Sequence, residues 1–258
     1  MVAIGKTERY INEAISREGG ILSVIIDPVD WPSPDAAVKA GIAAAEAGAD
    51  LVAVGGSMGA QGELLDVVTK SIKEKVSVPV VLFPGNIATL TRYADAVYFM
   101  SLLNSRNPYW ISQAQTLAAP IVKRLGIEPL PMGYIVVEPG GTVGWVGDAN
   151  LVPRNKPGIA AALALGGQYS GCRIIFTDAG SASADGPVPV EMVHAVANTI
   201  DVPYLVAGGI RSPKEAAAII GAGADWVQIG TAAEKAKEPK KAIGEFVKAV
   251  KEEGKRRI

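Results

Sequence analysis

The sequence has few of the residues that most often carry redox or metal chemistry, with one cysteine and one histidine among 258 residues. The single cysteine, Cys172, excludes a disulfide within the chain and is typical of a protein kept in a reducing compartment. It lies beside an apolar run, so we expect a small core residue rather than a nucleophile. The histidine, His194, falls on an expected outer helix at 190–199. The sequence therefore offers no Ser-His-Asp set and no zinc-spaced set of Cys and His.

Strong charge and long apolar runs are also missing. The formal net charge of −1 gives no electrostatic case for a nucleic-acid partner. Gly, Pro or a charged residue interrupts each apolar run well short of the roughly 20 residues that a membrane span needs, so we expect no transmembrane segment. Residues 1–20 lack an apolar core followed by a cleavage site and are predicted to form a short amphipathic helix, not a signal peptide. These features predict a cytoplasmic protein.

Apolar residues, by contrast, are plentiful and recur in short runs. They make up 49% of the chain, while charged residues make up 20%. The runs are apolar throughout rather than alternating, as expected of parallel strands covered on both faces. Ala-rich amphipathic stretches lie between them, for example 35–47 and 213–220. The eight expected strands are 21–26, 51–54, 79–83, 96–100, 133–137, 173–176, 204–206 and 226–229.

One unit of the pattern occurs twice. Residues 43–57 and 216–232 both predict a helix, a Gly-Ala-Asp turn, an apolar strand and then Gly with Ser or Thr. With no break in composition, eight such units favour a closed (β/α)8 TIM barrel over a doubly wound sheet. We therefore predict one α/β domain over residues 1–258 that begins with a short helix. The longest irregular stretch, 138–157, is expected to be functional.

Glycines follow the seventh and eighth expected strands. In such barrels the active site lies at the carboxyl ends of the strands, and a phosphate site often uses the loops after strands seven and eight. Gly208-Gly209 and Gly230-Thr231 occupy those places, and Ser181 after the sixth strand adds a hydroxyl donor. Each glycine pair read alone predicts a tight turn equally well. Their combined position predicts a phosphate site.

Three more polar residues follow expected strands. Asp27 and Ser57, after the first two strands, form a reasonable Mg²⁺ shell together with waters and substrate phosphate oxygens. Asp27 alternatively caps the next helix. Asp178, after the sixth strand, is placed either to accept a proton and hold a substrate hydroxyl or to cap a turn. Spacing alone leaves both pairs of alternatives open.

The stretch 133–157, GYIVVEPGGTVGWVGDANLVPRNKP, resembles the fifth loop region of the geranylgeranylglyceryl phosphate synthases and their heptaprenylglyceryl phosphate synthase relatives. The run VEPGGTVGWVGDA is long and unusual, and supporting matches occur along the chain from about residue 21 to the last helix. These matches are IIDP, VGGS, FPGN, TDAGS, VAGGIRSP and WVQIGTA.

The resemblance implies a TIM barrel that transfers a prenyl group from a prenyl diphosphate, most often geranylgeranyl diphosphate, to the primary hydroxyl of sn-glycerol 1-phosphate. Diphosphate leaves, Mg²⁺ is required, and the product carries the first ether bond of archaeal-type membrane lipids. Family members occur as dimers and hexamers, so the resemblance implies a homo-oligomer. It also carries roles to individual residues. The metal residues fall on Asp27 and Ser57, and the catalytic and hydroxyl-holding residue on Asp178. The glycerol-phosphate residues fall on Phe176, Thr177, Asp178, Ala179, Gly180, Ser181 and Ala182, and on Gly208, Gly209, Gly230 and Thr231.

The chain departs from the family pattern at several of these positions. The usual Tyr and Glu of the sixth loop are Phe176 and Asp178, and its last Gly is Ala182. The second acidic residue after the first strand, Asp30, is displaced by one position and is given no role. Two other readings stay open. The glycine loops after strands seven and eight also occur in other phosphate-binding barrel enzymes, of the phosphosugar isomerase or indole-glycerol-phosphate type, and the departures favour a barrel that binds a lipid precursor without turnover. Trp145, Tyr134 and Tyr169 are candidates for lining a prenyl groove.

Overall fold

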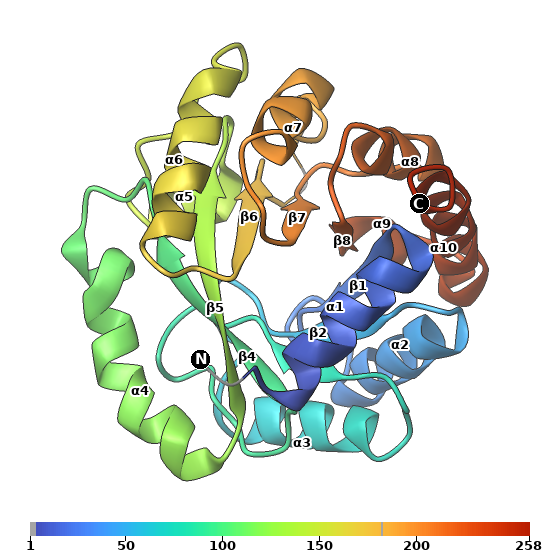
Figure 1. Cartoon of the computed structure of the whole chain (residues 1–258). Helices are drawn as coiled ribbons and strands as arrows, with labels where there is room; N and C mark the ends of the chain where they lie inside the picture. Colours follow the sequence, from blue (N-terminus) through green and yellow to red (C-terminus); the bar gives the residue numbers. More distant parts are fainter. Residues whose placement is uncertain (1–3, 182) are drawn as a thin grey trace.

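The computed structural model describes residues 4–181 and 183–258, and its centre is a closed parallel barrel of eight strands (Figure 1). Each strand pairs with the strands that precede and follow it in the sequence, and β8 closes the barrel on β1. The predicted barrel is therefore confirmed. The strands are β1 (Ile21–Ile26), β2 (Leu51–Val54), β3 (Val80–Leu82), β4 (Ala96–Leu102), β5 (Glu128–Val136), β6 (Ile174–Asp178), β7 (Tyr204–Ala207) and β8 (Trp226–Ile229).

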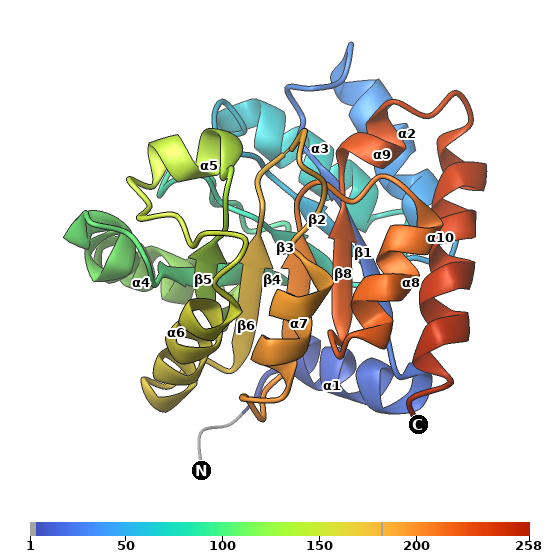
Figure 2. The same cartoon turned by 90° about the horizontal axis from the view of Figure 1, so that it is seen from above.

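Helices surround the barrel and cover its ends. Helix α1 (Lys6–Glu18) lies across the amino-terminal end of the strands, while α5 (Gly141–Val146) and α9 (Thr231–Glu234) lie beyond their carboxyl ends (Figure 2). Among the described residues, no helix combines the length and apolar character needed to cross a bilayer. The outer helices are α2 (Pro34–Glu46), α3 (Gly62–Lys73), α4 (Ala114–Leu125), α6 (Pro157–Tyr169), α7 (Val190–Ala197), α8 (Pro213–Gly221) and α10 (Pro239–Gly254), and a π-helical turn η1 (Tyr109–Gln113) precedes α4.

One unit of the barrel lacks its helix. Residues 83–95, all of them described, join β3 to β4 through turns alone. Pro84 and Gly85 begin this segment, and the side chain of Asn86 accepts a hydrogen bond from the backbone of Ala88 at 2.7 Å, which favours a turn over a helix. No helix therefore connects β3 to β4, and the outer face of β4 is left uncovered on the side next to β3.

Strand β5, expected at 133–137, begins earlier at Glu128, and the ends of β3 and β4 shift by one or two residues. Two further expectations, about the residues that follow the fifth and sixth expected strands, need correction. Thr177 and Asp178, expected in the loop after the sixth strand, are the last residues of β6 and pair in register with Ile135 and Val136 of β5. The stretch 138–157, expected to be irregular, contains α5. Both differences arise because pairing and packing with neighbouring elements extend regular structure into residues of low intrinsic propensity.

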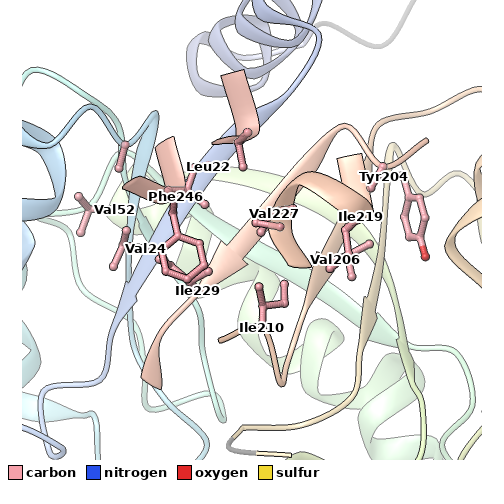
Figure 3. Packing of buried hydrophobic residues seen from close by; sticks show 14 of the residues in the cluster. Leu22, Val24, Val52, Tyr204, Val206, Ile210, Ile219, Val227, Ile229 and Phe246 are labelled. Carbon is pink, nitrogen blue, oxygen red and sulfur yellow. The ribbon is translucent and has the colours of Figure 1, made fainter. Parts of the chain in front are cut away.

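The core has two layers. The outer layer lies between the barrel and its helices, where Phe246 of α10 packs beside Val24 and Ile229, which are register partners on β1 and β8 (Figure 3). The inner layer fills the barrel, and its largest members are the buried rings of Trp226 and Tyr98. The interior is thus a packed core rather than a channel, as in other TIM barrels.

Helix α1 closes the bottom of the inner layer. Ile11 is fully buried against it, and the carboxylate of Glu128 accepts the backbone N–H groups of Thr7 and Glu8 at 2.7 and 3.0 Å. Glu8 itself is 4% exposed and pairs with Arg173 through two hydrogen bonds of 2.7 and 2.8 Å. Two carboxylates and one guanidinium therefore fix α1 to β5 and to the start of β6.

We expect replacement of Arg173 by Met to lower the free energy of unfolding by about 3 kcal/mol, because it leaves the buried Glu8 carboxylate without its partner. Lys240 and Glu46 form an exposed pair with side chains 60% and 55% exposed. Replacement of Lys240 by Met is the matched control and should cost less than about 1 kcal/mol. Chemical denaturation measures both variants. Equal losses would show that α1 does not depend on the buried pair.

Candidate active site

A cavity of about 400 Å³ opens at the carboxyl ends of the strands. It collects residues from loops that are far apart in the sequence, because the ends of parallel strands meet at one rim. Helix α5 lies beside its opening and contributes Thr142, Val143 and Val146 to the wall. The predicted site residues that line the cavity are Asp27, Ser57, Asp178, Ser181, Gly208, Gly209, Gly230 and Thr231.

Four other predicted residues lie behind the cavity wall. The ring of Phe176 is fully buried and stacks on Tyr134 at 4.4 Å. The hydroxyl of Thr177 lies on the outer side of the barrel, 2.7 Å from that of Tyr204. The predicted residues that do not line the cavity are Phe176, Thr177, Ala179 and Gly180, and Ala182 lies outside the described residues.

Asp178 lies at the floor of the cavity and is held at both oxygens. Its Oδ2 accepts the hydroxyl of Tyr134 at 2.7 Å, and its Oδ1 accepts the backbone N–H of Gly180 at 2.7 Å. Burial raises the pKa of this carboxyl above its ordinary value, and the two hydrogen bonds oppose that rise. The arrangement gives a carboxylate of fixed orientation that takes up a proton more readily than an exposed aspartate.

The backbone around Asp178 requires glycine at one position. Gly208 has a φ of +81°, and a Cβ on it would lie 2.2 Å from Oδ1 of Asp178. Any other residue would therefore meet both backbone strain and a direct clash with the carboxylate. The positive φ of Gly208 agrees with the tight turn considered from sequence, and its role in a phosphate site stays a prediction.

Asp27 and Ser57 lie close together across the gap between β1 and β2. A Cβ on Gly56 would be 1.6 Å from Oδ2 of Asp27, so the carboxylate rests against the backbone that immediately precedes Ser57. Oδ1 of Asp27 accepts the backbone N–H of Val29 at 3.2 Å, whereas the next helix, α2, is capped by Ser33 and not by Asp27. One oxygen thus caps the turn while the other faces the loop of Ser57.

The mouth also holds acidic groups to which the sequence assigned no role. Asp30 and Glu234 line the cavity together with Asp27. Burial and the neighbouring Asp30 raise the pKa of Asp27 to about 6, against the hydrogen bond from Val29. Burial, Asp30 and Asp27 raise that of Glu234 to about 7, against the nearby Lys235. This side of the mouth is therefore a region of concentrated negative potential.

Arg211 is a cavity residue that sequence reasoning missed. Its guanidinium donates to the backbone carbonyl of Ser183 at 2.6 Å, and its backbone N–H donates to Glu215 at 2.8 Å. It follows the Gly208-Gly209 pair by two residues, within the motif VAGGIRSP. Its position next to an expected phosphate loop could have indicated an anion-binding residue, because arginine often binds phosphate.

The cavity continues into an apolar groove on the outside of the barrel. The groove runs between the outer face of β4 and helix α4, where residues 83–95 supply no covering helix. On α4 the lining residues recur every four positions, which places them on one face. The residues of this apolar groove are Ile87, Leu90, Val97, Phe99, Ala114, Ala118 and Val122.

Of the three aromatic residues considered for such a groove, only Tyr134 lines the cavity. Trp145 is 83% exposed on α5, and Tyr169 is 78% exposed at the carboxyl end of α6. Helix α6 runs back along the barrel, so its last residue lies at the opposite end from the mouth (Figure 2). The sequence did not reveal the groove because it arises from a missing helix rather than from a motif.

Comparison with known proteins identifies the family of the chain. The model of the PcrB family matches residues 17–250. The geranylgeranylglyceryl phosphate synthase of Pyrococcus horikoshii is 54% identical over 93% of both chains, and that of Thermococcus sibiricus is 52% identical over 98% of this chain and 99% of its own.

A solved structure agrees with the sequence matches. The crystal structure of (S)-3-O-geranylgeranylglyceryl phosphate synthase from Thermoplasma acidophilum in complex with substrate sn-glycerol-1-phosphate superimposes with a TM-score of 0.90. It is 35% identical and covers 97% of this chain and 100% of its own. The chain therefore belongs to the PcrB family.

Proposed function

We propose that the protein joins sn-glycerol 1-phosphate to geranylgeranyl diphosphate through an ether bond and releases diphosphate. The observation that carries this proposal is a single cavity with a polar mouth at one end and an apolar groove at the other. An enzyme that acts only on small polar phosphates would leave such a groove empty. The relatives that share half of their residues with this chain carry the name of the same activity.

The mouth offers the groups that a glycerol phosphate needs. Gly208 and Gly209 have positive φ angles of +81° and +71°, and this lets the backbone approach an anion closely. The hydroxyls of Ser181 and Thr231 add donors, and Arg211 adds positive charge. A phosphate held by these loops points its glycerol end toward the floor, where Asp178 lies.

Asp178 has the position and the proton affinity of a general base. In the proposed step the primary hydroxyl oxygen forms a bond to the first prenyl carbon as the bond from that carbon to diphosphate breaks. The hydroxyl proton passes to Asp178, while Tyr134 keeps hold of the other carboxylate oxygen. Because burial raises the pKa of Asp178, this carboxylate is a stronger base than an exposed aspartate.

We also propose that Asp27 and Ser57 bind Mg²⁺. The described residues contain no set of three or more His, Cys, Asp or Glu side chains placed to hold a metal ion. Mg²⁺, however, is usually bound by one or two carboxylates with waters and substrate phosphates, so the pair fits this ion. Unbalanced negative charge from Asp30 and Glu234 beside Asp27 favours a cation there. When bound, Mg²⁺ would neutralise the diphosphate and help it leave.

The apolar groove is our proposed place for the prenyl chain. The interior of the barrel is filled, so a long hydrocarbon must lie outside it. The walls of the groove carry no charge where they are formed by Val97 and Phe99 on β4 and by Ala118 on α4. The small alanines of α4 leave room where larger residues would close the groove.

Replacement of Asp178 by Asn should lower turnover at least about 100-fold, because it removes the proton acceptor while keeping the shape of the side chain. Binding of sn-glycerol 1-phosphate, measured by calorimetry, should remain. In the wild-type protein, kcat/KM should fall with decreasing pH through a pKa above that of an ordinary aspartate. This direction follows because the base must be ionised and its pKa is raised. Unchanged turnover in the variant would remove Asp178 from the mechanism.

Replacement of Ala118 by Trp should block the groove and lower kcat/KM for geranylgeranyl diphosphate more than about tenfold, since overfilling a packed apolar space is costly. The short donor dimethylallyl diphosphate should be affected less than about twofold. Leu117, the next residue on α4, is 55% exposed and does not line the cavity, so its replacement by Trp is the matched control. Equal losses with long and short donors would place the prenyl chain elsewhere.

Replacement of Asp27 by Asn should raise the Mg²⁺ concentration for half-maximal turnover at least about tenfold. Loss of a residue that only hydrogen-bonds to a metal ligand already lowers metal affinity by about this factor, so loss of a ligand should cost at least as much. Asp30 lines the same cavity and has no proposed contact with the ion, so its replacement by Asn is the control and should shift that concentration less. The measurement is a Mg²⁺ titration of EDTA-treated protein. Turnover that persists in EDTA would contradict the metal proposal.

A further inference from the structure

Gln228 lies at the floor of the cavity and has no role in the proposed reaction so far. It is on β8, 3% exposed, and forms part of the cavity lining. Its register partners are Ser23 on β1 and Ala207 on β7, so its side chain points into the barrel as theirs do. An amide at this depth is costly unless its polar atoms find partners.

The amide oxygen of Gln228 has two partners, and a chain of donors fixes its orientation. The indole N–H of Trp226 donates to the hydroxyl of Ser23 at 2.8 Å, and Ser23 then donates to Oε1 of Gln228 at 3.1 Å. The hydroxyl of Tyr98 donates to the same Oε1 at 3.0 Å. Burial raises the pKa of Tyr98, so this hydroxyl keeps its proton.

The reverse orientation of the amide is unfavourable. An indole N–H only donates, so Ser23 must accept from Trp226 and use its own hydrogen elsewhere. With the amide reversed, the hydrogens of Ser23 and Tyr98 would face N–H groups, and buried donors without acceptors are costly. The network therefore directs the Nε2 group of Gln228 away from Ser23 and Tyr98, toward the cavity.

The Nε2 group has no hydrogen-bond partner within the part of the chain that the structure describes. It carries two N–H donors. The side chain that holds it is almost entirely buried and lines the cavity. Two donors are thus presented to whatever occupies the floor of the mouth.

Asp178 faces the same floor from the other side of Ala207. Asp178 pairs with Ala207 and Ala207 with Gln228, so all three lie at one level of the barrel on adjacent strands. Neighbouring strands are about 4.8 Å apart, which separates the backbones of Asp178 and Gln228 by about 10 Å. The small side chain of Ala207 leaves the space between the carboxylate and the amide open.

We propose that Gln228 donates a hydrogen bond to the secondary hydroxyl of the bound glycerol phosphate and so selects its enantiomer. This inference rests on the proposed function. The glycerol end carries two adjacent hydroxyls, and the floor offers an acceptor at Asp178 and a donor at Gln228. The primary hydroxyl gives its proton to Asp178, and the secondary hydroxyl accepts from the amide.

The secondary hydroxyl is the group by which the two glycerol phosphate enantiomers differ. With the phosphate and the primary hydroxyl fixed, the enantiomer directs its secondary hydroxyl to the other side of the carbon chain. It then loses the bond to Gln228 and leaves the buried amide without a partner, which adds to the discrimination. Gln228 is therefore a specificity-determining residue.

The test is calorimetric binding of sn-glycerol 1-phosphate, its enantiomer sn-glycerol 3-phosphate and the achiral 3-hydroxypropyl phosphate to wild type and Gln228→Met. The variant should bind sn-glycerol 1-phosphate about three- to tenfold more weakly, the range for one neutral hydrogen bond. The ratio of its dissociation constants for the two enantiomers should approach one. 3-Hydroxypropyl phosphate lacks the secondary hydroxyl and should bind both proteins equally. The KM for geranylgeranyl diphosphate should stay unchanged.

Gln228→Glu provides a second variant, because it keeps an oxygen for Ser23 and Tyr98 and replaces the N–H donors by a second carboxylate oxygen. Its added negative charge should weaken all three phosphate ligands by a common factor, which leaves the ratio between them as the readout. This variant should lose the same preference. A variant that weakens all three ligands with the ratio between them unchanged would reveal a structural role and overturn the inference. Equal wild-type binding of sn-glycerol 1-phosphate and 3-hydroxypropyl phosphate would overturn it without any variant. A wild type that binds sn-glycerol 1-phosphate but transfers no prenyl group would contradict the proposed function alone.

Discussion

The packing of aromatic rings inside the barrel decides where ligands bind in this protein. The ring of Phe83 lies 5.5 Å from Tyr98 and 5.7 Å from Phe176, and Tyr98 lies 5.8 Å from Trp226. These rings fill the barrel up to the level of Asp178, so a polar ligand rests on them at the mouth. A hydrocarbon chain finds no space below and must leave sideways. The missing helix after β3 leaves the apolar groove open there, and we propose this groove for the prenyl chain.

The sequence predicted the barrel because its signals are local. The bounds of β1, β2 and β8 agree with the apolar runs that predicted them, and Gly208-Gly209 and Gly230-Thr231 follow β7 and β8 as expected. Asp27 and Ser57 were correctly placed near each other, because strand order alone brings the ends of β1 and β2 together. Their binding of Mg²⁺ stays a prediction.

What the sequence did not predict depends on contacts over long distances. Nothing near Gln228 indicates that its oxygen binds Ser23, 205 residues earlier, or that its nitrogen faces the mouth. Tyr134 was considered only for a groove, whereas its hydroxyl holds Asp178. The ring of Tyr134 stacks on Phe176, its register partner on β6, and its hydroxyl reaches Asp178 from the adjacent strand. The groove was not predicted because it results from the missing helix between β3 and β4, and no motif in the sequence marks that absence.

The closure of the barrel by its first helix has a consequence for synthesis on the ribosome. Helix α1 is made before the barrel, and its partners Glu128 and Arg173 are translated more than a hundred residues later. Until then, the apolar face that carries Ile11 has no barrel to cover, and the early strands have no floor. Helix α1 therefore cannot form these contacts until β5 and the start of β6 have been made, so it reaches its native place after most of the strands that it covers.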